Sequence, residues 1–423
     1  MATTTPGSAL TEWRKHWPLV AATMMGMSLA AMLTSVFGVI LGPIEQEFGW
    51  TRAQISSGPA VVSMMGLFLA IPAGHLIDRF GARRCGLVVI ACSFASIAGM
   101  SAIGDQLWQW WACWAIFGIA GSFTSTVWMA PVSTIFHKGR GMAIALTVSG
   151  TGISMTLAPG IAEWFVQHYS WRTGLLALGV MWCTATLPLV LAFVPNTTGP
   201  VDEAEDALAP VQDRNVGLTP REGFASPTLY ILFFASLLSA MTGVALILNL
   251  VPVLTFTGLT RTEAVTIAGS MGIASIVGRI VGGYLMDRYD VRRLAIGACV
   301  VSLGLPLSLL LGAGTFWAAM GGIIAYGLTG GMKMNAVVYL VSTHLGARSF
   351  GLFYGVISIT TTVAMGIGPL IANHIYDVSK SYTPVIWATV PGFILSGVLF
   401  ALLRPAPLLW RPEPEPTPEP AIA

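Results

Sequence analysis

Long apolar runs recur along the whole chain, and they constrain its fold more than any other feature. Each run is long enough for a helix that crosses a membrane, whose hydrocarbon core is about 30 Å thick and needs roughly 20 helical residues. The composition agrees, since 55% of the 423 residues are hydrophobic and 9% are charged, whereas soluble proteins carry about 25% charged residues. The sequence therefore predicts an all-α membrane protein and argues against a soluble enzyme.

The apolar runs predict twelve transmembrane helices in two six-helix halves. The predicted spans are 17–43, 54–77, 84–103, 108–136, 141–165, 171–194, 228–256, 262–286, 293–311, 316–344, 351–376 and 384–403. The polar stretch 195–226 contains several acids together with Pro and Gly, which is typical of a linker. The expected organisation is an N-terminal segment 1–16, a first half 17–194, the linker, a second half 227–403 and a Pro- and Glu-rich tail 404–423 that we expect to be disordered.

The basic residues predict the orientation of the helices. An even number of spans puts both termini on the same side, and most of the 21 Lys and Arg residues fall in loops on that side. Basic loops stay in the cytoplasm, so both termini and the linker are expected to be cytoplasmic. Two basic residues, Arg279 and Lys333, fall deep inside predicted spans instead of in loops or at the ends of spans.

A loop motif after the second span repeats after the eighth span. Both copies contain Gly, Asp and several Arg residues in the same order: Gly74, Asp78, Arg79 and Arg83 in the first half, and Gly283, Asp287, Arg288 and Arg292 in the second half. Glycine permits close helix approach, and Asp with Arg can pair across helices, so we expect these eight residues to latch one conformational state. The alternative is that the arginines only fix the membrane topology. Two six-helix repeats with a site between them are the plan of a secondary transporter.

The repeated motif, GxxxDRxGxRR in its first copy, resembles the signature of the major facilitator superfamily (MFS). A narrower resemblance begins at Ser35 with SVFGVILGPIEQEFGWTRAQIS and includes the Gly278-Arg279 pair. These residues resemble the bacterial branch of the monocarboxylate porters, to which the oxalate:formate antiporters are related. The resemblance implies transport of an organic anion, often with a proton, in the bacterial cytoplasmic membrane.

Arg279 and Lys333 are expected to lie at similar depths in the eighth and tenth spans. A charge at the bilayer centre costs about 2.5–3.5 kcal/mol, and no Asp or Glu lies deep in any predicted span to compensate for it. An anionic substrate is the obvious missing partner, because the planar fork of an arginine fits a carboxylate. The resemblance implies this role for Arg279. The alternatives are an arginine bonded to backbone carbonyls and basic side chains that snorkel to the interface.

The number of cations leaves the substrate class and the coupling open. A dicarboxylate would balance both charges, whereas a monocarboxylate would leave Lys333 to lose or gain a proton. The chain departs from the family at three places. The first predicted span has no charge where animal members have a lysine, Ser275 stands where they have an acid, and Asn249 stands where many bacterial relatives have His. Asn249 can bind a substrate by hydrogen bonds but cannot titrate, so exchange of anions remains an alternative to proton symport.

The remaining candidates for the cavity wall are Tyr326, Tyr339, Tyr354 and Trp128, although aromatic residues in membrane helices more often pack or lie at the interface. The predicted function is transport of a small organic anion, with a monocarboxylate favoured over a dicarboxylate or aromatic acid in exchange. A drug efflux pump would need an acid in the cavity, and a membrane sensor would need a soluble domain. We expect no catalytic residues, metal or cofactor, no nucleic-acid partner, and one chain acting alone in the lipid bilayer with H⁺ or a counter-anion.

Overall fold

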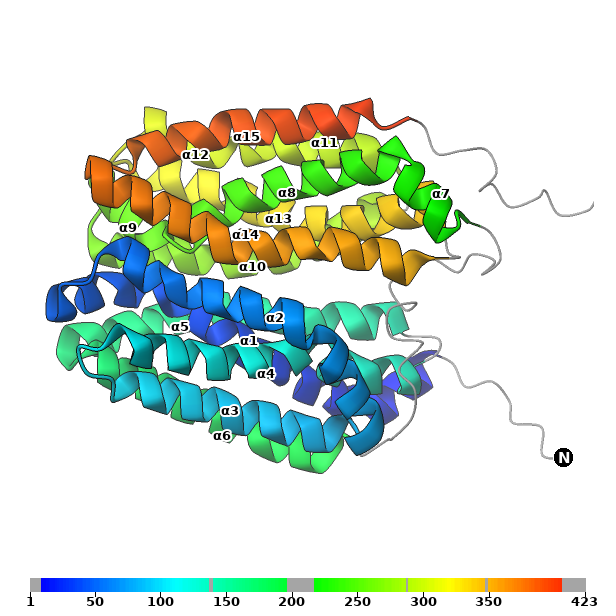
Figure 1. The fold of residues 1–423 in the computed structure, drawn as a ribbon, viewed down its shortest axis with the longest axis horizontal. Coiled ribbons are helices and arrows are strands. Elements are labelled where there is room, and N and C mark those ends of the chain that lie inside the picture. Colours follow the sequence, from blue (N-terminus) through cyan, green and yellow to red (C-terminus); the bar gives the residue numbers. More distant parts are fainter. Residues whose placement is uncertain (1–8, 137–139, 196–216, 287, 347–348, 405–423) are drawn as a thin grey trace, which may run out of the picture.

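The computed structural model describes residues 9–136, 140–195, 217–286, 288–346 and 349–404, which form long helices that run along one direction (Figure 1). The helices of the first half are α1 Ala9–Phe48, α2 Arg52–Phe80, α3 Ala82–Ser101, α4 Leu107–Ile135, α5 Arg140–His168 and α6 Trp171–Phe193. Those that follow are α7 Pro220–Ala225, α8 Pro227–Ile247, α9 Leu250–Phe256, α10 Arg261–Met286, α11 Val291–Ser302, α12 Gly304–Leu311, α13 Phe316–Leu345, α14 Phe350–Ser379 and α15 Thr383–Leu402.

Helices cover all twelve predicted spans, and two of these spans are broken helices. The predicted span 228–256 is α8 followed by α9, and the span 293–311 corresponds to α11 followed by α12. By length and composition, 10 of the described helical segments could cross a membrane. The other two predicted spans are α2 and α13, which have 29 and 30 residues. The protein is therefore a multi-pass, all-α membrane protein.

Both helix breaks come a few residues before a proline. α8 ends at Ile247 and α9 starts at Leu250, close to Pro252, while α11 and α12 meet at Leu303, close to Pro306. Proline has no N–H to bond the carbonyl four residues earlier and its ring crowds that carbonyl, which favours a break there. Apolar periodicity does not register such a break, so each pair was predicted as one helix.

Three segments differ from, or fall outside, the predicted organisation. α1 starts at Ala9, so part of the predicted segment 1–16 continues the first helix. The linker 195–226 contains α7, and its residues 196–216 lie outside the described residues. The tail 404–423 was predicted to be disordered, and its residues 405–423 also lie outside the described residues.

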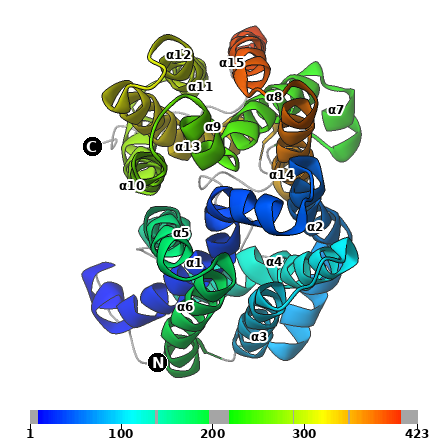
Figure 2. The same ribbon diagram turned by 90° about the vertical axis from the view of Figure 1, so that its left-hand side faces the viewer.

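The helices form two groups of six membrane-crossing units, α1–α6 and α8–α15, which lie side by side (Figure 2). Across the interface between these halves, α2 packs against α14, α5 packs against α10, and α1 packs against α9. We call the end of the bundle where α1 begins and α15 ends the basic end, because most basic loop residues fall there, and the other end the opposite end. α10 runs from the opposite end to the basic end, and α5 runs the other way.

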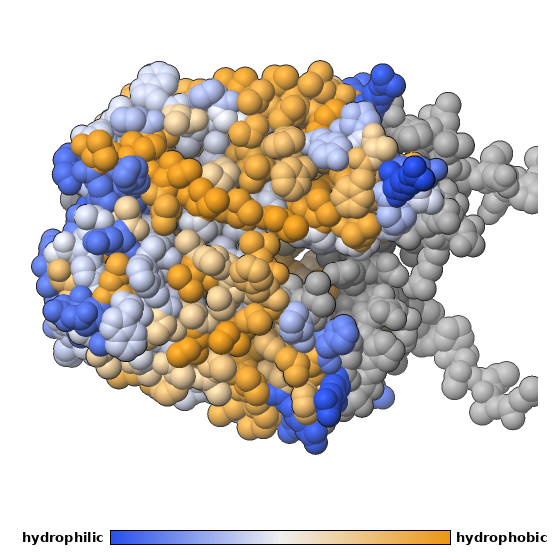
Figure 3. All heavy atoms as spheres, in the orientation of Figure 1, coloured by the Kyte–Doolittle hydropathy of each residue, from blue (hydrophilic) through white to orange (hydrophobic). Residues whose placement is uncertain are grey.

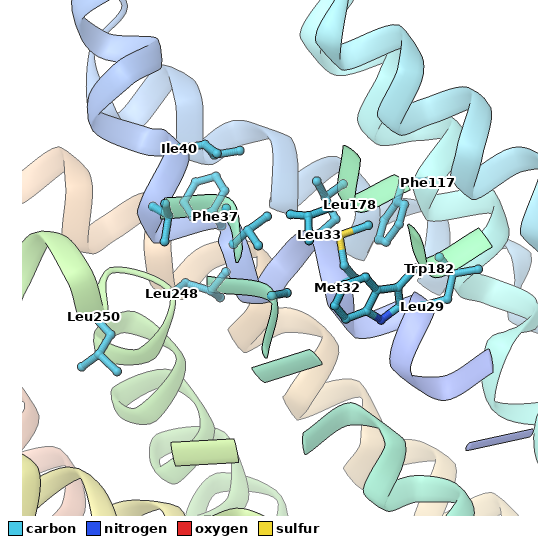
Figure 4. Close-up of a cluster of buried hydrophobic side chains, with 14 of the residues drawn as sticks. Leu29, Met32, Leu33, Phe37, Ile40, Phe117, Leu178, Trp182, Leu248 and Leu250 are labelled. Carbon is cyan, nitrogen blue, oxygen red and sulfur yellow. The ribbon is translucent and has the colours of Figure 1, made fainter. Parts of the chain in front are cut away.

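On the face seen in Figure 3, apolar side chains cover much of the middle of the bundle, and the most hydrophilic residues gather toward its two ends. Inside, a buried cluster follows α1 through the first half and includes Leu248 and Leu250 from the α8–α9 break (Figure 4). A Cβ at Gly38 of α1 would lie 3.1 Å from the carbonyl oxygen of Leu248. The two halves are thus in direct contact near the opposite end.

Candidate functional site

Arg279 belongs to α10 of the second half, but its side chain contacts the first half. Its Nη1 donates to the carbonyl oxygen of Val148 at 2.7 Å, and its Nη2 donates to the hydroxyl of Thr151 at 3.2 Å. Both partners lie on α5. The Nε of Arg279 is buried and has no hydrogen-bond partner among the described residues. The guanidinium therefore bridges the two halves with two nitrogen atoms and keeps a third donor unused.

Close packing of α10 on α13 fixes the backbone that carries Arg279. A Cβ at Gly331 of α13 would lie 2.3 Å from the carbonyl oxygen of Ser275 and 2.9 Å from the backbone nitrogen of Arg279. A Cβ at Gly278 would lie 2.0 Å from a backbone oxygen of α13. The Nδ2 of Asn335 donates to the carbonyl oxygen of Arg279 at 3.3 Å. Only glycine permits this approach, so the two helices hold Arg279 at a fixed depth.

Gly152 permits a similar approach on the other side of Arg279. A Cβ at Gly152 of α5 would lie 2.6 Å from Cγ1 of Ile276 and 2.9 Å from the carbonyl oxygen of Gly272, both on α10. Within α5, Gly152 follows Val148 by one turn, so its missing side chain leaves the Val148 carbonyl accessible from α10. This local packing brings Arg279 within reach of a backbone oxygen of the other half.

Lys333 lies inside the second half. Its Nζ donates to the hydroxyls of Ser239 on α8 and Ser302 on α11, at 3.1 and 3.0 Å. The same nitrogen lies 5.2 Å from the ring centre of Tyr326 and 5.0 Å from that of Phe393. Within the described part of the chain, neither Lys333 nor Arg279 forms an ion pair. Hydroxyl groups and aromatic faces solvate the ammonium instead.

The two cations point in different directions, so the structure does not bring them together around one small site. Gly331 faces α10, and Lys333 follows it by two residues, which is about 200° around the helix. Arg279 extends toward α5, whereas Lys333 extends toward α8, α11 and α15. Their predicted depths say nothing about this angle around the helix axis.

Asn249 is fully buried at the break between α8 and α9. Its Nδ2 donates to the carbonyl oxygen of Ala245 at 3.0 Å, and its Oδ1 accepts from Nδ2 of Asn373 at 2.7 Å. The same nitrogen of Asn373 contacts the hydroxyl of Ser56 on α2 at 2.5 Å, and the hydroxyl of Tyr382 donates to Oδ1 of Asn373 at 2.8 Å. The amide of Asn249 thus belongs to a buried network that joins the halves, and its role toward a substrate stays a prediction.

Charged groups join the halves at the opposite end. The carboxylate of Asp377 accepts from the backbone N–H of Arg52 and of the next residue at 3.1 and 2.8 Å. On the other pair of helices, Nε of Arg261 lies 2.6 and 2.7 Å from the two oxygens of Glu163. Nη2 of Arg261 also donates to the carbonyl oxygen of Val39 on α1 at 2.7 Å. These contacts close the interface at this end.

The interface is different at the basic end. Between two described residues of different halves, no hydrogen bond or ion pair lies nearer the basic end than the contact of Arg279 with Val148. In this conformation, the hydrogen bonds and ion pairs between described residues of the two halves therefore extend from the opposite end as far as Arg279.

The predicted aromatic residues occupy three environments. Trp128 is fully buried in the first half, where a Cβ at Gly26 would lie 2.4 Å from its ring. Tyr326 is buried beside the Lys333 ammonium. Tyr339 and Tyr354 are half-buried against the smaller hydrophobic cluster of the second half. None of the four contacts Arg279 through a hydrogen bond between described residues.

Among the described residues, the glycines of the repeated loop motif have no close neighbour. A Cβ at Gly74 or Gly283 would meet no described atom within 4 Å, so this conformation does not show the expected close helix approach at these positions. The side chain of Asp78 and the whole of Asp287 lie outside the described residues. The latch therefore stays a prediction.

The arginines of the motif make contacts within their own half. Arg83 donates to a carbonyl oxygen of α6, and Arg292 donates to that of Leu403, directly after α15, at 2.5 Å. The last helix of each half is thus held by the same arginine of the repeat. Arg79 lies over the ring of Phe80 at the end of α2, and Arg288 lies over the ring of Tyr284 near the end of α10, at 5.5 and 4.3 Å from the ring centres.

The sequence interpretation missed Val148, Thr151 and Asn373. Val148 acts through a backbone oxygen, which no pattern of side chains reveals. Thr151 and Asn373 are polar residues inside apolar spans, and this was the signal available for them.

Comparison with known proteins agrees with this architecture. The model of the Major Facilitator Superfamily matches residues 23–369 and, in a second match, 232–423. A gallate transporter of Pseudomonas putida is 25% identical, with 84% of this chain and 89% of the relative covered. Monocarboxylate transporter 12-B of Danio rerio is 22% identical, with 93% and 86% covered, and human monocarboxylate transporter 6 is 22% identical, with 91% and 79% covered.

Among solved structures, the chain is similar to a bacterial homologue of the human lysosomal transporter Spinster in an inward-facing and occupied conformation. The TM-score is 0.68 at 15% sequence identity, and 94% of this chain and 97% of that chain are covered. These relatives and this fold are those of transporters, not enzymes. The chain belongs to the Major Facilitator Superfamily.

Proposed function

We propose that this protein moves a small organic anion, a monocarboxylate in the first place, across the bacterial cytoplasmic membrane by alternating access. The observation that carries the proposal is the guanidinium of Arg279. It is a permanent cation at the interface of the two halves, its partners are a carbonyl and a hydroxyl, and its Nε is unbonded among the described residues. A carboxylate from the substrate would supply the missing negative charge.

The names of the relatives support this substrate class. Gallate is an aromatic acid with one carboxylate, and the other relatives are named for monocarboxylates. A dicarboxylate that bridges Arg279 and Lys333 is less well supported, because Arg279 extends from α10 toward α5 whereas Lys333 extends from α13 toward α8 and α11. A drug efflux pump, which would need an acid in the cavity, has less support still. Glu163 is the one buried acid among the described residues, and it is paired with Arg261.

We assign the basic end to the cytoplasm, because loops rich in Lys and Arg remain there. Closure at the opposite end then corresponds to a carrier that faces the cytoplasm. We propose that a single chain is the functional unit, since both halves that enclose the site belong to it. Coupling to H⁺ or to a counter-anion is decided by the experiment below.

Uptake into proteoliposomes tests the proposal. Labelled lactate, benzoate, gallate and oxalate would be offered with an inward proton gradient, and separately to vesicles preloaded with the same acid. Arg279→Gln would be compared with Arg293→Gln, a matched control because the side chain of Arg293 is 82% exposed and its carboxylate partner lies 3.9 Å away.

We expect uptake of the monocarboxylates by the wild type and by the control. In Arg279→Gln, loss of the two charged hydrogen bonds to the substrate carboxylate should weaken the apparent affinity for substrate about 100-fold. Uptake driven by the gradient would assign proton symport, whereas uptake only into preloaded vesicles would assign exchange. Transport of none of the acids, or full activity of Arg279→Gln, would overturn the proposal.

A further inference from the structure

The five N–H groups of a guanidinium form two edges that can each hold a pair of acceptors. The end edge consists of one N–H from Nη1 and one from Nη2. The side edge consists of the Nε–H and the second N–H of Nη2. In Arg279, Nη1 donates to Val148 and Nη2 donates to Thr151, while Nε has no partner among the described residues. The two acceptors on α5 lie only 3.0 Å apart, as the end edge requires, so α5 occupies that edge and the side edge keeps the pair of donors that a carboxylate needs.

The hydroxyl of Thr151 has no orientational freedom left in this arrangement. Its Oγ1 donates to the carbonyl oxygen of Val148 at 3.0 Å, three residues earlier on the same helix. Because its proton is used there, its lone pairs are available to the guanidinium and accept from Nη2. Arg279, Val148 and Thr151 thus form a closed ring of three hydrogen bonds that fixes the plane of the guanidinium.

The anchor comes from the half of the protein that does not carry Arg279. The long side chain of arginine would otherwise sample many rotamers, at an entropic cost whenever one of them is selected. With α5 in place, the guanidinium is already oriented before a substrate arrives, which is the usual way in which preorganisation improves affinity.

We propose that Thr151 is a positioning residue for substrate binding: it holds the end edge of Arg279 so that the side edge receives the substrate carboxylate. This inference rests on the proposed function, because it requires that Arg279 binds an organic anion. It adds a residue of the first half to a site whose charge comes from the second half. Affinity then depends on how closely α5 lies to α10.

Thr151→Val tests the inference, because valine keeps the shape of the side chain and removes the hydroxyl. Thr151→Ser restores the hydroxyl, and Thr147→Val is the matched control. Thr147 lies one turn earlier on α5, and its hydroxyl contacts that of Thr23 at 2.9 Å within the first half. KM and Vmax for labelled benzoate or gallate would be measured in proteoliposomes beside Arg279→Gln, with thermal unfolding as a measure of folding.

We expect Thr151→Val to raise KM about tenfold, the effect of one hydrogen bond to a charged group, with Vmax within about twofold of the wild type. Thr151→Ser should return KM to near the wild-type value, and Thr147→Val should leave it there. If the valine variant does not reach the membrane, Thr151→Ala replaces it in the same comparison.

An unchanged or lower KM in Thr151→Val would overturn the positioning role, as would a serine variant that behaves like the valine variant. These outcomes differ from failure of the proposed function itself. In that case the wild type would take up no acid, or Arg279→Gln would transport normally, whatever the Thr151 variants do.

Discussion

Neutralising Glu163 should shift the carrier toward a conformation that is open at the opposite end. Glu163 is on α5, its partner Arg261 is on α10, and Arg261 also donates to Val39 on α1. Opening this end must separate the two halves and break both contacts. Glu163→Gln removes the ion pair with Arg261 while keeping the size of the side chain.

The magnitude follows from the exposure of the two partners. Truncating one member of a buried pair costs about 3–5 kcal/mol, whereas exposed pairs contribute about 0.2–1 kcal/mol. The side chain of Glu163 is 5% exposed and that of Arg261 is 36% exposed. Water can therefore partly solvate the charge of Arg261 once its carboxylate partner is removed. We therefore expect Glu163→Gln to reduce the free energy that favours closure of the opposite end by about 1–2 kcal/mol, which raises the ratio of open to closed molecules about 5–30-fold.

Spin labels at two exposed loop positions of the opposite end provide the assay. Gln106→Cys marks the first half and Ala313→Cys marks the second half, in a chain whose native cysteines are replaced by alanine. Pulsed electron resonance would then give the distribution of distances between the labels. We expect a larger fraction of long distances in Glu163→Gln.

The matched control is Glu47→Gln. Glu47 pairs with Arg172 at 2.8 Å, also at the opposite end, but both residues belong to the first half. Its loss should leave the distances between the halves unchanged. Unchanged distances in Glu163→Gln, or an equal change in both variants, would refute the reasoning.

Three further predictions concern the site and its surroundings. Gly331→Ala should lower uptake and the unfolding temperature, because its Cβ would lie 2.3 Å from the carbonyl oxygen of Ser275 and overpacking costs about 1–3 kcal/mol. The control is Gly330→Ala, whose Cβ would have its nearest neighbour 3.7 Å away. Equal effects of the two substitutions would contradict the packing argument. Asn373→Leu should shift the label distances in the same direction as Glu163→Gln, because it breaks the buried network between the halves; unchanged distances would count against a role in closure. If Lys333 is the proton site, Lys333→Met should abolish uptake driven by a pH gradient while exchange continues, and full gradient-driven uptake by this variant would exclude that role.

Most of the fold could be predicted from the sequence, because the apolar runs have the length that a membrane demands and two copies of one motif mark equivalent places. The helix breaks at Asn249 and Leu303 were not predicted. Hydropathy is insensitive to them, since the residues on both sides of each break remain apolar. Many other prolines of this chain lie within unbroken helices, such as Pro159 in α5, so proline alone does not identify a break.

The candidate site was predicted in part. Arg279 was singled out because a charge in an apolar span needs a partner, and the structure locates it at the interface of the halves. Depth along a helix follows from residue number, but the direction of a side chain depends on how the helix is rotated against its neighbours. That rotation is set by glycines such as Gly331 and Gly152, whose contacts lie on helices far away in the sequence. For this reason the separation of Lys333 from Arg279, and the anchor at Thr151, could not be predicted.

The hydrogen-bond partners of the two intramembrane cations also have a consequence for the biosynthesis of the chain. Arg279 is bonded to α5, and Lys333 is bonded to Ser239 and Ser302. All these partners precede their cation in the sequence, and a chain is synthesised from its N-terminus. Each cation therefore reaches the bilayer, where an unsolvated charge is costly, after the groups that will solvate it have been made. The order of the helices thus lets the second half assemble against partners that are already present.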